Sequence, residues 1–218
     1  MSNNHHETRS NYDRLSRWYD FLSGSSERPA RMRGLQMLQV QPDEQVLEIG
    51  CGTGESFSVL DSCVGSKGRV FGLDLSGGML DVAKNKAQKL FLSNVDCLQG
   101  DVLHLPFPDE SFDAVFMSFT LELLPASEMP AVLQECKRVL HAGGRMGVVS
   151  LLQKQKPGWM ERLYTWAHYR WTRIIDCRPI PVENIVGSAG FEKSSFREMS
   201  MWGLTVGILV AVKTIENK

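Results

Sequence analysis

The segment from Val46 to Gly54, Val-Leu-Glu-Ile-Gly-Cys-Gly-Thr-Gly, restricts the fold more than any other part of the chain. Its apolar start predicts a buried strand, and its three glycines predict a tight turn into a helix. Small residues in such a turn let a ligand approach the backbone, where the N–H groups of the next helix are free to bind it. Alone, this pattern also fits a dinucleotide site or a turn without a ligand.

The region from residue 45 to 150 alternates short apolar runs with longer segments of helical period, which predicts βαβ units and a parallel sheet. The expected strands are Gln45–Ile49, Arg69–Leu73, Val95–Leu98, Phe112–Met117 and Arg145–Ser150. The expected helices between them are Ser56–Cys63, Gly78–Phe91 and Ser127–His141, the last stopped by Gly143-Gly144. The flanks predict helices over Glu27–Gln39 and Val182–Ala189 and an apolar strand over Met201–Val212. A chain of 218 residues with this pattern is expected to form one domain.

Polar side chains follow the next three strands at the points where these strands end. Asp74 ends the second strand, where a carboxylate can accept hydrogen bonds from two ribose hydroxyl groups. Asp101 follows the third strand at a place suited to an adenine amino group, and the fourth strand ends at Ser118. Because the carboxyl ends of parallel strands meet at one edge, we expect these residues and the glycine loop to line one crevice.

The charge around this crevice favours one cofactor over another. Glu48 would place negative charge beside the pyrophosphate of a nicotinamide dinucleotide, which argues against a dehydrogenase. Residues 101–135 add seven acidic side chains and no Lys or Arg. Such a site fits a ligand that carries a sulfonium and an ammonium group better. The formal net charge of -1 gives no overall basic field for nucleic acid.

Taken together, these motifs resemble the class I S-adenosylmethionine-dependent methyltransferases, and more narrowly the ubiquinone/menaquinone-biosynthesis methyltransferases (methyltransferase type 11). The resemblance spans roughly Tyr12 to Lys213. Its motifs are Glu48 to Gly54, Asp74-Leu75-Ser76-x-x-Met79-Leu80, Leu105-Pro106-Phe107 before Ser111-Phe112-Asp113, and Arg138-Val139-Leu140 before Gly143-Gly144. It implies an α/β, Rossmann-like fold with a mostly parallel seven-stranded sheet, an antiparallel last strand and helices on both faces.

The resemblance also implies roles for individual residues. Asp74 would hold the ribose hydroxyl groups, and Leu75 and Met79 would flank the adenine. The implied cofactor-binding set is Tyr12, Tyr19, Glu48, Gly50, Cys51, Gly52, Gly54, Asp74, Leu75, Met79, Gly100, Asp101, Val102 and Ser118. Residues 1–41 would be an N-terminal helical segment that covers the cofactor site. Residues 42–218 would be the methyltransferase domain, with a substrate-cap insertion at 151–180.

Methyl transfer from a sulfonium requires no fixed catalytic residue, since alignment and exclusion of water supply much of the rate. The candidates for a general base are His168, Tyr169, Glu122 and Tyr19, and each of them also fits a purely structural role. His104 and His141 fit a loop and a helix end. The five cysteines are scattered and include no Cys-x-x-Cys pair, so we expect reduced thiols, no metal site and a cytoplasmic protein.

The methyl acceptor is the least determined feature. The fourth strand ends in Met117-Ser118-Phe119-Thr120, without the Asn/Asp-Pro-Pro-aromatic signature of amino-group DNA methyltransferases, so nucleic-acid methylation is not expected. The resemblance suggests a polyprenyl quinol ring carbon, a phospholipid amine or a soluble small metabolite as acceptor, and a non-catalytic protein that binds the cofactor is the further alternative. The cap departs from the quinone enzymes in its Asp176 to Pro181 stretch.

Residues 151–180 combine six basic and two acidic side chains, a balance of 6 − 2 = +4, with five interleaved Trp and Tyr residues. This composition fits a lid for a hydrophobic substrate or a peripheral contact with the inner face of a membrane. It fits a packed helix with a solvated basic face equally well. No run approaches ~18 apolar residues, and Met1 to Asn11 lacks the apolar core of a secretory signal. The sequence does not indicate an oligomeric state.

Overall fold

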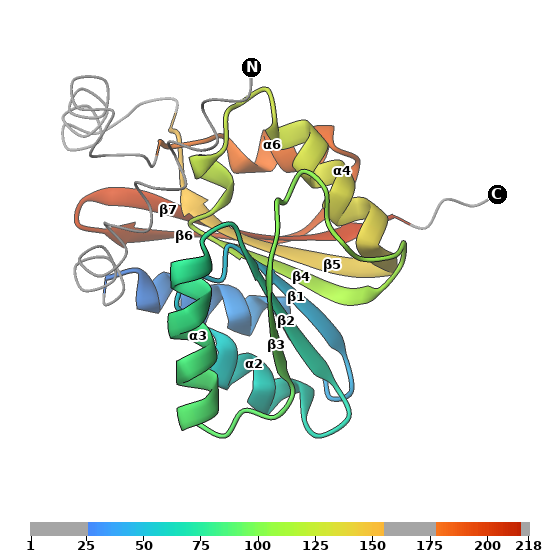
Figure 1. The fold of residues 1–218 in the computed structure, drawn as a ribbon. Coiled ribbons are helices and arrows are strands. Elements are labelled where there is room, and N and C mark those ends of the chain that lie inside the picture. The colour runs from blue at the N-terminus through green and yellow to red at the C-terminus, as the bar shows by residue number, and fades with distance from the viewer. Residues whose placement is uncertain (1–25, 155–177, 215–218) are drawn as a thin grey trace, which may run out of the picture.

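The computed structural model describes residues 26–154 and 178–214, which are built on a seven-stranded sheet of order β3-β2-β1-β4-β5-β7-β6 (Figure 1). The strands are β1 (Gln45–Ile49), β2 (Arg69–Asp74), β3 (Val95–Gln99), β4 (Phe112–Ser118), β5 (Leu140–Leu151), β6 (Phe191–Met201) and β7 (Leu204–Lys213). The first five strands in this order, β3, β2, β1, β4 and β5, pair in parallel, whereas β7 runs antiparallel to both β5 and β6. The α/β, Rossmann-like fold expected from the sequence is therefore confirmed.

Helices cover both faces of the sheet (Figure 1). One face packs against residues 26–38, α2 (Phe57–Val64) and α3 (Gly77–Lys89). The other packs against α4 (Met129–Val139) and α6 (Val182–Ser188). Strand β4 shows how the two cores arise, since Ala114 and Phe116 enter the first core and Val115 and Met117 the second. A strand buried on both faces has one continuous apolar run, which is why its position could be predicted. Within the described residues, no helix is long and apolar enough to cross a bilayer.

The predicted end of the third helix is wrong. Helix α4 ends at Val139 and β5 begins directly at Leu140, so Gly143-Gly144 lies inside the irregular first part of β5 and does not stop a helix. The reason is a tertiary contact. The N–H groups of Glu110 and Ser111 donate to the last helical carbonyls, those of Arg138 and Val139, at 2.9 and 2.7 Å. These bonds satisfy the helix end without a glycine cap.

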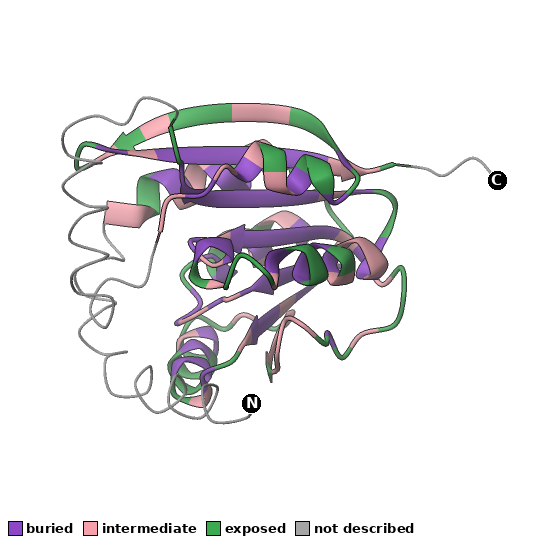
Figure 2. Cartoon of the chain, turned by 90° about the horizontal axis from the view of Figure 1, so that it is seen from above, coloured by how far each residue is buried: buried purple, intermediate pink, exposed green. Residues whose placement is uncertain are grey.

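Strand β6 was not predicted from the sequence, and the last apolar strand was predicted to begin at Met201. Met201 ends β6, and the chain reverses at Trp202-Gly203, both with positive φ (52° and 80°). Two residues of this conformation form a tight hairpin turn. Strand β6 pairs on one side only, and most of its positions are exposed or half-buried, whereas β7 is mostly buried (Figure 2). An edge strand needs few apolar residues, so its sequence carries little strand signal.

Candidate cofactor site

The strand register brings the predicted site residues to one edge of the sheet. Ile49 at the end of β1 pairs with Leu73 of β2 and Met117 of β4, and Asp74 pairs with Gln99 at the end of β3. The glycine loop, Asp74, the Gly100-Asp101 turn and Ser118 thus follow neighbouring strand ends. This is the edge at which open α/β sheets bind ligands.

The glycine loop has the backbone form that its sequence predicted. Gly50, Gly52 and Gly54 have φ angles of 67°, 53° and 74°. This region of positive φ favours glycine. The Gly50 N–H donates to the Leu73 carbonyl at 2.7 Å, which ties the loop to β2. A Cβ on Gly50 would overlap the side chain of Thr120, whereas a Cβ on Gly52 would meet no atom within 4 Å. Gly50 is therefore required for close packing against Thr120, whereas Gly52 borders open space.

This contrast predicts different effects for two matched substitutions. Gly50→Ala and Gly52→Ala both place alanine at positive φ, at a cost of about 1–2 kcal/mol. Only Gly50→Ala adds the clash with Thr120, so we expect it to lower the free energy of unfolding further than Gly52→Ala does. Gly52→Ala should mainly weaken the binding of S-adenosylhomocysteine. Urea unfolding and calorimetry measure the two effects, and equal destabilisation by both variants would contradict the assignment of Gly50 to packing.

Asp74 connects the glycine loop to the start of α3. Its Oδ2 accepts a hydrogen bond from the Gly52 N–H at 2.8 Å, and its Oδ1 accepts one from the Ser76 N–H at 2.9 Å. Ser76 in turn caps α3, because its Oγ accepts from the Met79 N–H at 3.3 Å. The half-buried carboxylate is thus held in a fixed position beside the loop. A carboxylate oxygen can accept more than one hydrogen bond, so these contacts are compatible with ribose binding.

Two loops meet beside Asp74. The Gly100 N–H donates to the Asp74 carbonyl at 3.1 Å, and the Gln99 side chain donates to the Leu75 carbonyl at 2.9 Å. Leu75 is 42% exposed and offers an apolar surface directly after a strand. The Asp101 Oδ1 accepts from the Leu103 N–H at 2.9 Å. An apolar surface beside carboxylates fits an adenosine group.

Glu48 is the most unusual group of the site. Its side chain is only 3% exposed, and its Oε2 has no hydrogen-bond partner within the described part of the chain. Burial raises its pKa to about 7, while the neighbouring Ser56 hydroxyl and the Arg31 charge lower it by smaller amounts. A buried carboxyl oxygen without a partner is costly, and an ammonium ligand would satisfy it. Burial, with Glu48 nearby, also raises the pKa of the Cys51 thiol, which therefore stays protonated.

Among the four base candidates, Glu122 is the one that the structure describes. Tyr19, His168 and Tyr169 lie outside the described residues, as does the cofactor candidate Tyr12. Glu122 belongs to the turn η1 (Leu121–Leu123) after β4, is 1% exposed, and accepts from the Leu151 N–H through Oε1 at 3.1 Å. Burial raises its pKa to about 8, the backbone N–H groups of Glu122 and Leu151 lower it, and Glu27 raises it slightly. His104 and His141 are exposed.

Sequence reasoning noted the Arg138 motif but missed its function in the structure. Its guanidinium donates to Glu135 Oε1 at 2.7 Å, to Asp109 Oδ1 at 2.9 Å and to the carbonyls of Leu105 and Phe107 at 3.0 and 2.8 Å. These bonds hold the loop that follows Asp101 against α4. The spacing of the two motifs, Leu105 to Phe107 and Arg138, was the available signal.

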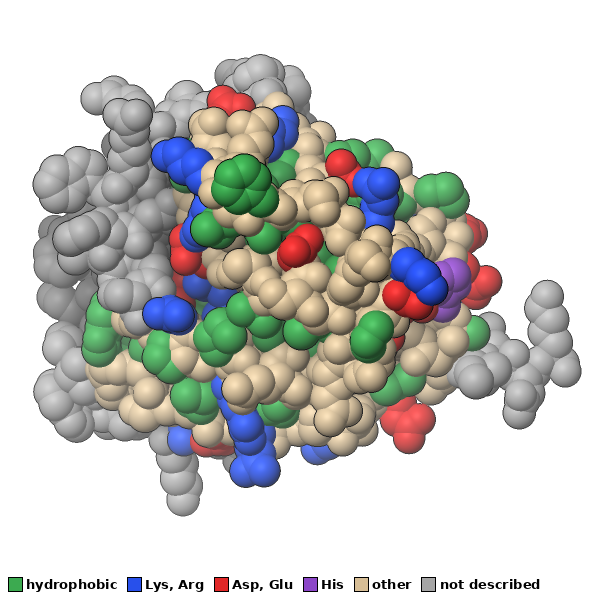
Figure 3. All heavy atoms as spheres, turned by 90° about the horizontal axis from the view of Figure 1, so that it is seen from below, with side chains coloured by type: hydrophobic (Ala, Val, Ile, Leu, Met, Phe, Trp, Pro, Cys, Tyr) green, Lys and Arg blue, Asp and Glu red, His purple; other side chains and the backbone are tan. Residues whose placement is uncertain are grey.

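Charges elsewhere on the surface are mixed. On the face shown in Figure 3, acidic and basic side chains of the described residues are interspersed, and neither sign gathers into a large patch. In the same part of the chain, no three His, Cys, Asp or Glu side chains group as metal ligands would.

Comparison with known proteins agrees with this geometry. Residues 46–144 match the family described as a methyltransferase domain. The chain carries a class I methyltransferase domain. The cofactor of this class is S-adenosylmethionine, and the carboxylates, the open space at Gly52 and the exposed Leu75 fit its ammonium, ribose and adenine groups. A SAM-dependent methyltransferase from Aquifex aeolicus superposes with a TM-score of 0.64 at 24% identity, over 84% of this chain and 89% of that one, which shows the shared fold.

Two relatives have a higher sequence identity to this chain than the Aquifex protein has. A demethylmenaquinone methyltransferase of Listeria welshimeri is 34% identical over 158 residues, which cover 72% of this chain and 65% of the relative. A 2-phytyl-1,4-naphtoquinone methyltransferase of Synechococcus elongatus is 35% identical over 147 residues, covering 67% of this chain and 61% of the relative. The chain therefore matches somewhat less than two thirds of the length of either relative.

Proposed function

We propose that this protein transfers the methyl group of S-adenosylmethionine to a small hydrophobic acceptor, with the ring carbon of a reduced quinone as the first candidate. The observation that carries the proposal is the methyltransferase site itself, in which the glycine loop, Glu48, Asp74 and Asp101 follow adjacent strand ends. The acceptor class is supported by the two relatives, because both are named for a quinone that they methylate.

When bound, S-adenosylmethionine supplies a methyl group that its sulfonium has already activated. The protein then has to hold the donor in line with the acceptor and keep water away. Asp74 would fix the ribose, Leu75 and Met79 would enclose the adenine, and Glu48 would neutralise the ammonium group. Two of these side chains already have restricted positions, since Asp74 is bonded to two backbone N–H groups and Met79 is 9% exposed.

A quinol carbon becomes a strong nucleophile when the ring hydroxyl loses its proton. We propose that Glu122 Oε2 accepts this proton. What supports the assignment is a buried carboxyl oxygen without a partner among the described residues, next to the ends of β4 and β5. Glu122 would take the hydroxyl proton before the new C–C bond forms, and would return it to the ring oxygen as the ring carbon releases its own proton to solvent. The bond between the methyl carbon and the sulfonium sulfur would break as the C–C bond forms, so the products would be the methylated quinol, S-adenosylhomocysteine and one proton.

Two other acceptor classes stay open to test, a phospholipid amine and a soluble metabolite. Incubation with methyl-labelled donor and separate lipid, quinone and soluble extracts, followed by mass spectrometry, distinguishes them. We expect label in the quinone fraction, and label in soluble compounds alone would defeat the hydrophobic-acceptor proposal. Binding of S-adenosylhomocysteine without any transfer would favour a non-catalytic protein.

Membrane contact through residues 151–180 stays a prediction, as does the covering of the site by residues 1–41. Residues 155–177 and 1–25 lie outside the described part of the chain.

A further inference from the structure

A nearly buried arginine of the first helix lies close to the buried carboxyl group of the site. Arg31, on the helix at residues 26–38, has a side chain that is 12% exposed and pairs with Glu27 one turn earlier, at 3.1 Å between Nη2 and Oε2. The same helix packs on the sheet face that carries Phe116 and Val149. Gly34, one turn after Arg31, lies against Phe116, and Phe116 is the β4 residue that pairs with Glu48 of β1. In agreement with this placement, the charge of Arg31 lowers the pKa of Glu48, against the larger opposite effect of burial.

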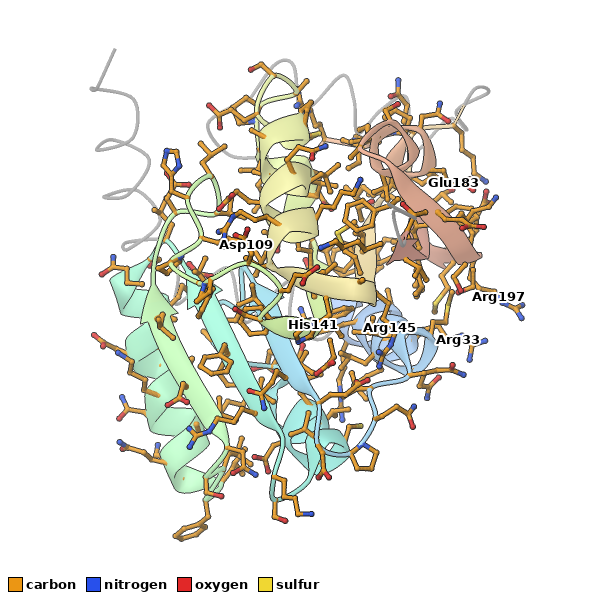
Figure 4. All side chains as sticks on the ribbon, turned by 90° about the vertical axis from the view of Figure 1, so that its right-hand side faces the viewer. Arg33, Asp109, His141, Arg145, Glu183 and Arg197 are labelled. Atoms are coloured by element: carbon orange, nitrogen blue, oxygen red, sulfur yellow. The ribbon has the colours of Figure 1, made fainter. Side chains whose placement is uncertain are left out.

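The orientation of this helix is fixed at its far end. The Arg145 guanidinium donates to the carbonyls of Leu38 and Gln39 at 2.6 and 2.7 Å and pairs with Glu44 at 2.6 Å (Figure 4). These bonds satisfy the last carbonyls of the helix and hold its C-terminal end next to the residue before β1. Because β1 starts at this end of the sheet, the first turns of the helix, with Arg31, lie toward the edge where β1 ends.

We propose that Arg31 binds the carboxylate of the methionine part of S-adenosylmethionine, beside Glu48, which binds the ammonium group of the same amino acid. The methionine end of the cofactor carries one positive and one negative charge. Arg31 and Glu48 offer the two opposite charges on adjacent elements, which lets the zwitterion enter a buried site without leaving a charge unpaired. The Glu27 bond uses one of the guanidinium N–H donors, and a guanidinium can bind a second carboxylate with the others.

This inference rests on the cofactor alone and does not depend on the proposed acceptor. Its test compares two ligands that differ by the amino acid portion, S-adenosylhomocysteine and 5′-methylthioadenosine, in calorimetric titrations of the full chain. The Arg31→Met variant keeps an unbranched side chain without its charge. We expect this variant to bind S-adenosylhomocysteine about 10- to 100-fold more weakly, the usual effect of a lost charged hydrogen bond. Its affinity for 5′-methylthioadenosine should stay unchanged.

The matched control is Arg33→Met, two residues along the same helix. Arg33 bonds only to Gln36 among the contacts described, at 3.2 Å on the exposed side of the helix (Figure 4), so neither ligand should be affected. Arg31→Lys should retain part of the discrimination, and it replaces Arg31→Met in the comparison if that variant does not fold. Equal weakening of both ligands by the Arg31 variants, or no weakening of either, would overturn the assignment. If the wild type transfers no methyl group while the Arg31 variants still distinguish S-adenosylhomocysteine from 5′-methylthioadenosine as expected, only the proposed function would be refuted.

Discussion

Replacing Asp74 by alanine is expected to weaken the binding of S-adenosylhomocysteine by roughly 100-fold or more, since hydrogen bonds to a charged group contribute about 1.5–3 kcal/mol each. Two effects add. The ribose hydroxyl groups lose their acceptor, and the N–H groups of Gly52 and Ser76 lose the carboxylate that now holds them at 2.8 and 2.9 Å. The glycine loop would then have to be ordered by the ligand itself. Calorimetric titration measures the loss.

The control for this substitution is Asp96→Ala on β3. Asp96 is a half-exposed carboxylate that pairs with Arg69 at 2.9 Å, on the strand next to the one that Asp74 ends. A surface ion pair of this kind contributes little, so affinity and stability should change only slightly. Unchanged affinity in Asp74→Ala, with the protein folded, would refute the ribose assignment.

Replacing Glu122 by glutamine is expected to lower kcat by about 100-fold or more, the usual contribution of a general base. The amide oxygen can still accept from the Leu151 N–H, so the contact at 3.1 Å survives while the proton acceptor is lost. In the wild type, kcat should rise with pH toward a plateau above about pH 8, because the base acts in its ionised form and its pKa is about 8. The pH profile of the variant should lack this step.

As the pH rises, the free energy of unfolding of the wild type should fall while its kcat rises. The two measurements therefore separate an effect on catalysis from damage to the fold. Glu122 stays neutral in the folded protein up to about pH 8, whereas in the unfolded chain it ionises near 4.5. Raising the pH between these values therefore favours the unfolded chain, and the wild type should lose on the order of 4 kcal/mol through this group. Glu122→Gln removes that loss. Urea unfolding at pH 5 and pH 8 measures it.

The exposed Glu192 on β6 provides the control, since Glu192→Gln should leave both the activity and the pH dependence of stability as they are. Parallel stability profiles for the wild type and Glu122→Gln would show that Glu122 is not buried as a neutral group. Full activity of Glu122→Gln would refute its assignment as the base.

The features that could be predicted from the sequence are those that depend on local pattern. The ends of strands β1 to β4 were predicted to within one residue, because β1, β2 and β4 are enclosed runs of apolar residues, and the edge strand β3 keeps three apolar residues among its five. The glycine loop follows from its spacing. The start of β5 and the edge strand β6 could not be predicted in this way, since a contact with Ser111 and a single neighbouring strand define them.

The charged groups of the site show the same limit. The sequence singled out Glu48, Asp74 and Asp101 because each lies within, ends or follows a strand. Nothing local indicates that Glu122 is buried, since its contact is the Leu151 N–H, 29 residues away. Arg31 looks like any basic residue of an amphipathic helix, and its position near Glu48 emerges only when the helix packs on the sheet.

The most direct test of the proposed activity is methyl transfer to a short-tailed 1,4-naphthoquinol that is kept reduced, with deuterated methyl on the donor and the oxidised quinone as control. Mass spectrometry of the product then locates the label. We predict that the methyl group appears on a ring carbon of the reduced acceptor and not on the oxidised one, because only the reduced ring can be ionised to a nucleophile. An unlabelled ring, with label on a phospholipid amine or a soluble metabolite supplied in parallel, would contradict the account.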